Sequence, residues 1–148
     1  MALFLSAGLC GCLSETTDDQ EIELEVNHQV SNGTIIESYS DGEKVSTDNV
    51  VIDFDFSNTI SSSDLITFGI DKMDGSTPVE IDADLSSIIS LEFSYHGIYG
   101  LSAYAIDVQE NKQNISILIQ IDLVMEWTEF NTNNPSTLTF DPTPSNEG

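Results

Sequence analysis

The chain has 148 residues, enough for one domain with a hydrophobic core, and its 39% hydrophobic content is that of a globular protein. Its 26 Asp and Glu residues against 3 Lys and Arg residues give a formal net charge of −23. Phosphate backbones and anionic membrane surfaces repel such a chain, so the charge excludes nucleic acid as a partner and excludes electrostatic membrane binding. We interpret the charge as adaptation of the surface to salty surroundings, and a dedicated metal site is the alternative.

The amino-terminal residues 1–13 form a short apolar segment, which a polar run follows. A membrane-spanning helix needs about 20 apolar residues, whereas the apolar part of a secretion signal has about 7–15. The segment therefore indicates a signal, with residues 14–20 as a polar tether. No Lys or Arg precedes the apolar run, so either the true start lies upstream or the signal is atypical.

Both cysteines of the chain lie in this segment, so no disulfide bond is expected in the folded domain. Leu9, Cys10, Gly11 and Cys12 resemble the lipobox of prokaryotic lipoproteins, which has an aliphatic residue three positions before a cysteine and a small residue just before it. The resemblance implies lipid attachment at Cys12, with Cys10 as the alternative. The other interpretation is a truncated signal whose cysteines are incidental.

Apolar and polar residues alternate along most of the remaining chain, and no helical periodicity is present. The alternating stretches are residues 22–26, 50–57, 66–71, 79–83, 89–95, 99–105 and 115–125. Turn-forming residues separate them at 31–33, 41–42, 61–64, 74–75 and 110–111. About seven short strands with such spacing predict an all-β chain that folds as a β-sandwich. The sandwich is expected over residues 21–130, and the Pro- and Asn-rich residues 131–148 are expected to form a flexible tail or linker.

Part of the chain resembles a PKD domain, an immunoglobulin-like sandwich found in many surface proteins. The first matching run is Phe54-Asp55-Phe56-Ser57, then Ser61-Ser62-Ser63-Asp64, then Ile70 to Thr77. The closer match follows, at Tyr95, Gly97, Tyr99, Leu101, Ala103, Ala105 and Asp107. The resemblance covers residues 45–124, and it implies extracellular display, contact with protein or carbohydrate, and no catalytic residues.

Three residues of the closer match have expected structural roles. Gly97 is expected where a side chain would clash or where φ is positive. Tyr99 is expected to point inward and to donate its hydroxyl to a nearby backbone group, as in a tyrosine corner. Asp107 is expected to cap the turn before Asn114.

No catalytic residue is predicted. The sequence contains no phosphate loop, no dinucleotide fingerprint and no Gly-x-Ser-x-Gly motif. His28 and His96 have no neighbouring ligand at the spacing of a zinc site, and His96 is interpreted as a plain turn residue.

Calcium is the only cofactor considered, with Asp71, Asp74 and Asp107 as weak candidate ligands because they lie in or beside loops. Solvated acidic turns are the alternative interpretation. Asn32 and Asn114 begin glycosylation sequons, which matter only if the host glycosylates surface proteins.

The sequence therefore predicts a non-enzymatic module, lipid-anchored or secreted, for adhesion, recognition or spacing at a prokaryotic cell surface. Its partner is expected to be a surface protein or a carbohydrate. One alternative is an accessory module of a secreted hydrolase whose catalytic part is missing from this chain. Another is a subunit of a surface filament or layer, joined by strand addition at open sheet edges.

Overall fold

The computed structural model describes residues 22–137. The expected signal, the tether and the last part of the expected tail lie outside the described residues. The strands are β1 (Ile22–Glu23), β2 (Asn27–His28), β3 (Asn32–Ser40), β4 (Glu43–Asp48), β5 (Val50–Asp55), β6 (Ile60–Ser61), β7 (Leu65–Asp71), β8 (Val79–Asp82), β9 (Ile88–Phe93), β10 (Gly97–Asp107) and β11 (Lys112–Thr128). Within this part of the chain, no helix has the length and apolar character needed to cross a membrane.

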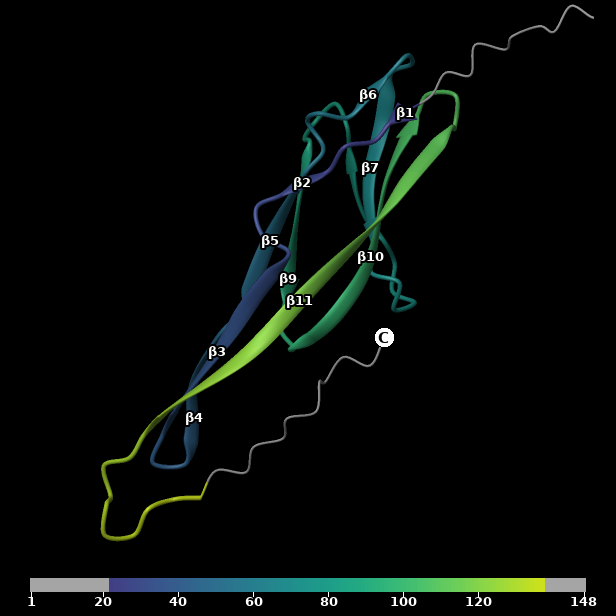
Figure 1. Ribbon diagram of the computed structural model, residues 1–148. Coiled ribbons are helices and arrows are strands. Elements are labelled where there is room, and N and C mark those ends of the chain that lie inside the picture. The colour runs from purple at the N-terminus through teal and green to yellow at the C-terminus, as the bar shows by residue number, and fades with distance from the viewer. Residues whose placement is uncertain (1–21, 138–148) are drawn as a thin grey trace, which may run out of the picture.

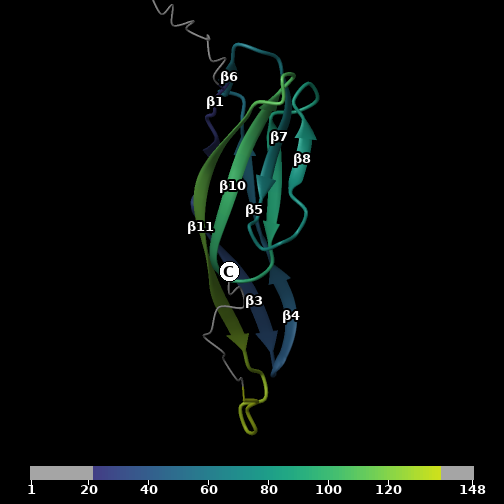
Figure 2. The same ribbon diagram turned by 90° about the vertical axis from the view of Figure 1, so that its right-hand side faces the viewer.

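Two sheets pack face to face in an elongated molecule (Figures 1 and 2). The larger sheet has the order β4-β3-β11-β10-β7-β8, the smaller has the order β2-β5-β9, and β1 pairs with β6 at one end. The predicted all-β sandwich is confirmed. The described residues hold eleven strands instead of about seven, because β3, β4 and the two-residue strands β2 and β6 were not predicted.

The core lies between the two sheets and follows the predicted alternation. The buried residues of the central strands are Ile52 and Phe54 on β5, Ile89, Leu91 and Phe93 on β9, Leu101, Ala103 and Ala105 on β10, and Ile117, Ile119 and Ile121 on β11. Phe56 and Phe68 stack in this core with ring centroids 4.8 Å apart. Burial of this apolar surface, at about 25 cal/mol per Å², is the main term that offsets the chain entropy lost on folding.

The predicted turn at residues 31–33 is wrong in part, because Asn32 and Gly33 begin β3. A Cβ atom at position 33 would lie 2.5 Å from Cγ1 of Val50, so glycine is required there by the close approach of β5. The turn at Asp41 and Gly42 is real, and both residues have positive φ angles, of 48° and 89°. These are the conformations of a two-residue hairpin turn that reverses the chain between β3 and β4.

The alternation expected for residues 66–71 also fails at its first residue. Ile66 is 40% exposed, whereas Leu65 packs against the core. The register between β7 and β10 shifts between Ile106 and Asp107, so one residue of β7 is left over as a β-bulge. The bulge turns Ile66 outward and restores the alternation at Phe68.

The larger sheet extends further along the strand direction than the smaller one. β11 has 17 residues, and its second half pairs in parallel with β3 from Gln120↔Asn32 to Thr128↔Ser40. Its pairing with β10 reaches only to Ile121↔Gly97, so the end of β11 runs on with β3 and β4 alone (Figure 1). We call this three-stranded extension the overhang, and it comprises β3 from Thr34, β4, and β11 from Asp122.

The two faces of β5 provide a test of this packing. We expect Phe54→Ala, which removes a fully buried side chain, to lower the free energy of unfolding by about 3–5 kcal/mol. Val51→Ala, on the exposed face of the same strand, is expected to cost less than about 1 kcal/mol. Urea denaturation of both variants measures the difference, and equal losses would contradict the assigned faces.

Candidate functional site

A groove lies where the overhang meets the turn between β9 and β10. In the sandwich, the inner face of the larger sheet is covered by the smaller sheet. On the overhang, Ile35 is still buried in the core, and beyond Ile35 the same face extends past the smaller sheet. The groove is lined by Ile35, Glu37, Lys44, Thr47, Asn49, Ser94, Tyr95, His96 and Leu123. Its volume is about 410 Å³, and ligand sites typically measure about 300–1,000 Å³.

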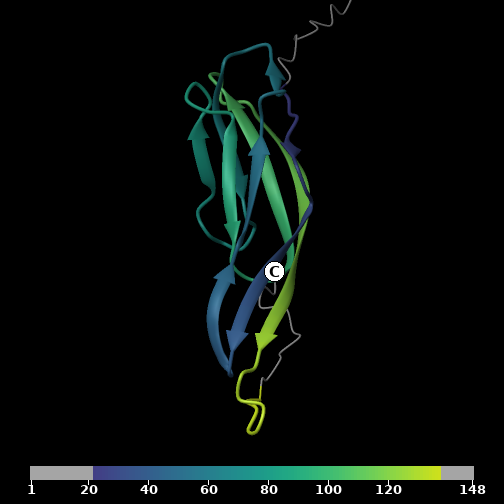
Figure 3. The same ribbon diagram turned by 90° about the vertical axis from the view of Figure 1, so that its left-hand side faces the viewer.

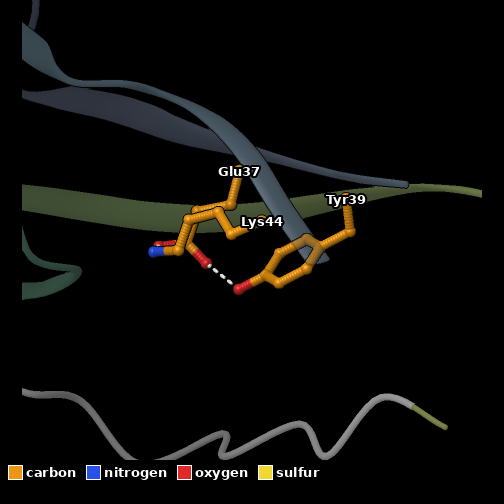
Figure 4. Close-up of polar contacts among 3 residues, drawn as sticks. All are labelled: Glu37, Tyr39 and Lys44. Atoms are coloured by element: carbon orange, nitrogen blue, oxygen red, sulfur yellow. Dashed lines mark hydrogen bonds and ion pairs between the residues drawn. The ribbon is translucent and has the colours of Figure 1, made fainter. Parts of the chain in front are cut away.

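Glu37 is the centre of the polar contacts in the groove (Figure 4). Its Oε1 accepts a hydrogen bond from Lys44 Nζ at 2.5 Å, and its Oε2 accepts one from the Tyr39 hydroxyl at 2.7 Å. The hydrogen bond from Lys44, and after it the one from Tyr39, lowers the pKa of the Glu37 carboxyl. The charges of Lys44 and His96 lower this pKa further. The same contact raises the pKa of Lys44, so this pair is fully charged at neutral pH.

Tyr39 is itself held by Trp127, the residue opposite it on β11. The two rings stack with centroids 5.9 Å apart and an interplanar angle of 22°. Both side chains are half-buried and follow Glu37 and Leu123 along the inner face of the overhang. The stack therefore fixes the Tyr39 hydroxyl that orients the Glu37 carboxylate.

The tip of the overhang is closed by the segment that follows β11. The Asp41 carboxylate accepts hydrogen bonds from the backbone N–H groups of Phe130 at 2.8 Å and Asn131 at 3.2 Å. These bonds, that of Phe130 first, lower the pKa of the Asp41 carboxyl. The hydroxyl of Ser136 donates to the carbonyl of Asp41 at 3.0 Å. Residues 129–137, which include the start of the expected tail, thus contact the turn between β3 and β4.

The turn between β9 and β10 forms the other wall. The Tyr99 hydroxyl donates to the Tyr95 carbonyl at 2.7 Å, and the Tyr99 ring meets Phe93 edge-on with centroids 4.8 Å apart. Gly97 has a φ of 150°, in the region that favours glycine. With its backbone anchored in this way, the Tyr95 side chain lines the groove and is 63% exposed.

The chain passes from the larger sheet to the smaller between β4 and β5 (Figure 3). Asn49 is the residue between these two strands. Its side-chain amide donates to Glu92 Oε1 at 2.5 Å. That bond uses the nitrogen and leaves the amide oxygen of Asn49 as an acceptor at the groove. The groove therefore offers donors and acceptors beside an exposed aromatic ring.

Asp107, predicted to cap a turn, is fully buried at the end of β10. Its Oδ1 accepts from the backbone N–H groups of Gln109 and Asn111, each at 2.9 Å, and its Oδ2 accepts from the Asn111 side chain at 2.9 Å. Burial would raise the pKa of this carboxyl, but the hydrogen bonds from Asn111 and Gln109 outweigh burial and lower the pKa. Asp107 therefore holds the turn before β11.

The three weak calcium candidates are not brought together. Asp107 lies opposite Leu65, at the start of β7, whereas Asp71 ends that strand opposite Ser102. The carboxylates of Asp71 and Asp74 accept backbone hydrogen bonds within their own loop, from Met73 and Ser76. Residues 22–137 contain no group of three or more His, Cys, Asp or Glu side chains that could hold a metal ion.

The remaining candidate residues lie apart from the groove or outside the described part of the chain. Asn32 is exposed at the start of β3, and Asn114 is exposed on β11, where its amide donates to Ser102 Oγ at 3.4 Å. Cys10 and Cys12 lie outside the described residues.

The residues of the groove were not predicted as a site. Glu37, Lys44 and Asn49 lie around strands that the sequence did not reveal, and Tyr95 and His96 were assigned to an ordinary strand end and turn. One signal was available: Lys44 is one of only three cations in a chain with 26 acidic residues, which makes a fixed ion pair at that position informative.

No model of a known protein family matches the chain, and no curated protein is similar to it in sequence. Five solved chains match its fold. One belongs to work described as the structural basis for the promiscuous specificity of the carbohydrate-binding modules from the β-sandwich superfamily. It superposes with a TM-score of 0.53 at 14% sequence identity, over 72% of this chain and 36% of that chain. This chain thus spans about a third of the length of the structure it matches, and the likeness concerns the sandwich fold.

The contact between Lys44 and Glu37 can be tested directly. Because Lys44→Met removes the hydrogen bond and the charge, we expect the pKa of the Glu37 carboxyl to rise toward its usual value, measured by NMR titration of the side chain. A carboxyl with a lowered folded-state pKa stabilises the fold above its unfolded pKa, and this contribution is lost as the pH falls through the folded value. The stability difference between wild type and variant should therefore be present at neutral pH and vanish in acid.

The matched control is Lys72→Met, which removes a cation from the loop between β7 and β8. It should leave the titration of Glu37 unchanged. An unchanged Glu37 titration in Lys44→Met would show that the ion pair is absent in solution.

Proposed function

We propose that this chain is a non-enzymatic recognition module that binds carbohydrate in the groove of the overhang and is displayed outside the cell. The observation that carries the proposal is the exposed Tyr95 ring beside Glu37, Lys44 and Asn49. A sugar ring has an apolar C–H face and a rim of hydroxyls that both donate and accept hydrogen bonds. An aromatic face next to fixed polar groups complements both features.

The fold of the chain supports the same function. A solved structure of similar fold comes from work on carbohydrate-binding modules, which are non-catalytic. The resemblance of residues 45–124 to a PKD domain also favours contact with carbohydrate or protein at a surface. In this chain, the residues that would make such contacts are those that line the groove.

Display outside the cell rests on the amino-terminal sequence. The apolar residues 1–13 have the length of a secretion signal, and the Leu-Cys-Gly-Cys run resembles a lipobox. A lipid at Cys12 would supply about 0.8 kcal/mol per buried CH₂ group and would anchor the module to a membrane. The polar residues 14–20 would then separate the sandwich from the lipid surface. If the chain is instead the accessory module of a secreted hydrolase, it would bind carbohydrate in the same groove.

Binding is tested with the intact protein on a panel of neutral and acidic polysaccharides, by retardation in gels that contain each polysaccharide. We expect at least one to retard the protein, and Tyr95→Ala to weaken that interaction about tenfold, which corresponds to ~1.4 kcal/mol. Leu118→Ala removes an exposed apolar side chain from the opposite face of β11 and should bind as the wild type does. Failure of every polysaccharide to retard the wild-type protein would refute the proposal.

Anchoring is tested by the intact mass of the protein from the membrane fraction of a prokaryotic host that processes lipoproteins. The wild type and Cys10→Ser are expected to carry lipid on a chain that begins at Cys12. Cys12→Ser is expected to lack the lipid and to leave the membrane fraction. Loss of lipid in Cys10→Ser alone would reassign the attachment, and an unmodified wild-type chain that retains Met1 would refute the anchor.

A further inference from the structure

We infer that the groove selects neutral glycans and rejects glycans that carry carboxylate or sulfate groups, an inference that rests on the proposed carbohydrate-binding function. The selection comes from the way Glu37 cancels the single lysine of the groove. It also comes from the net negative charge of the chain, formally −23.

The only lysine that lines the groove, Lys44, forms an ion pair with Glu37. Its Nζ lies 2.5 Å from Glu37 Oε1, and the Tyr39 hydroxyl holds the other carboxylate oxygen at 2.7 Å. The exposed fraction is 47% for the Lys44 side chain and 18% for the Glu37 side chain. A ligand can therefore reach the ammonium for a hydrogen bond, but it meets a pair with no net charge.

The other two lysines do not line the groove. Lys112 begins β11, far along that strand from the groove, and its Nζ lies 3.5 Å from the centroid of the Tyr104 ring. Tyr104 in turn donates its hydroxyl to Glu80 at 2.5 Å. Lys72 lies in the loop between β7 and β8. No lysine or arginine of residues 22–137 thus remains to bind an anionic ligand in the groove.

The surface around the groove is acidic. Glu92 accepts a hydrogen bond from Asn49, and Asp41 is exposed in the turn between β3 and β4. Glu43 and Asp48 are also exposed, on the outer face of the same hairpin, opposite Ser40 and Ile36. Two like charges about 10 Å apart in water repel by only ~0.4 kcal/mol, but an anionic chain would meet several of them. This repulsion is screened over about 8 Å at physiological ionic strength, so it should weaken as salt rises.

A neutral sugar meets none of this repulsion. Thr47 and Ser94 add hydroxyls to the Asn49 amide, the Lys44 ammonium and the Glu37 carboxylate, so both kinds of hydrogen bond are available. Stacking on Tyr95 does not depend on the charge of the ligand. Binding of a neutral glycan should therefore be nearly independent of salt.

The test uses ligand pairs that differ in one functional group. Each neutral polysaccharide that binds is compared with the same polymer after its primary alcohols have been oxidised to carboxylates, and natural acidic polysaccharides are included. We expect the oxidised form to bind the wild-type protein about tenfold or more weakly at low salt, and the difference to shrink at high salt.

Two variants separate the local charge from the overall charge. Glu37→Gln leaves the Lys44 charge unbalanced, so it should reduce the discrimination against the oxidised polymer several-fold. Glu126→Gln changes the net charge equally on the outer face of β11 and should keep the wild-type discrimination. Equal effects of the two substitutions would overturn the role assigned to Glu37.

The outcomes distinguish this inference from the function on which it rests. Preferred binding of oxidised or naturally acidic polymers would overturn the selection of neutral glycans while the carbohydrate-binding function stands. Absence of binding to every polymer would overturn both. Neutral binding that falls steeply with salt would also refute the inference, because the charged residues would then hold the ligand.

Discussion

The parallel pairing of β3 with β11 is the constraint on which the rest of the structure depends. Nine residue pairs join these strands, and the pairing continues after β10 has turned away at Gly97. The larger sheet therefore extends beyond the smaller one, and its inner face continues into solvent. Inside the sandwich that face carries Ile119 and Ile121, and on the overhang the same face carries Glu37 and Lys44. The appearance of charged residues on this face marks the end of the core and the start of the groove.

The sandwich itself could be predicted because most of its strands have one face in the core. In each central strand every second residue is apolar, and in β9 and β11 these residues are the ones that the structure buries fully or in part. Ile88, Leu118 and Val124 are apolar as well, but they lie on the outer faces and are exposed. β4 could not be found in this way, since all six of its residues are exposed and neither face gives a pattern. β3 was hidden by Asn32 and Gly33, which resemble a turn, although Gly33 is required by the close approach of Val50. The bulge at Ile66 is set by its partner strand, which no local pattern reveals.

The groove could not be predicted for a related reason. Its residues come from the β3–β4 hairpin, the β4–β5 junction and the β9–β10 turn, and only the parallel pairing of β3 with β11 brings them together. Tyr95 sits in the PKD-like stretch, where a tyrosine counts as part of the scaffold. The structure divides that role: Tyr99 anchors the turn through its hydroxyl, and Tyr95 supplies the carbonyl while its ring lies in the groove. Two tyrosines four residues apart thus have opposite roles, which sequence spacing alone does not separate.

The acidity of the chain bears on both the overhang and its groove. Among the strands of residues 22–137, the overhang has two edges without a partner strand, on β4 and on the end of β11, and such edges invite pairing with another chain. A second copy would bring another formal charge of −23, and Glu43 and Asp48 lie directly on the β4 edge. This repulsion opposes assembly by strand addition between copies and so weighs against a filament of this chain alone. The same charge opposes anionic ligands at the groove, whereas it sets no electrostatic penalty on a neutral ligand.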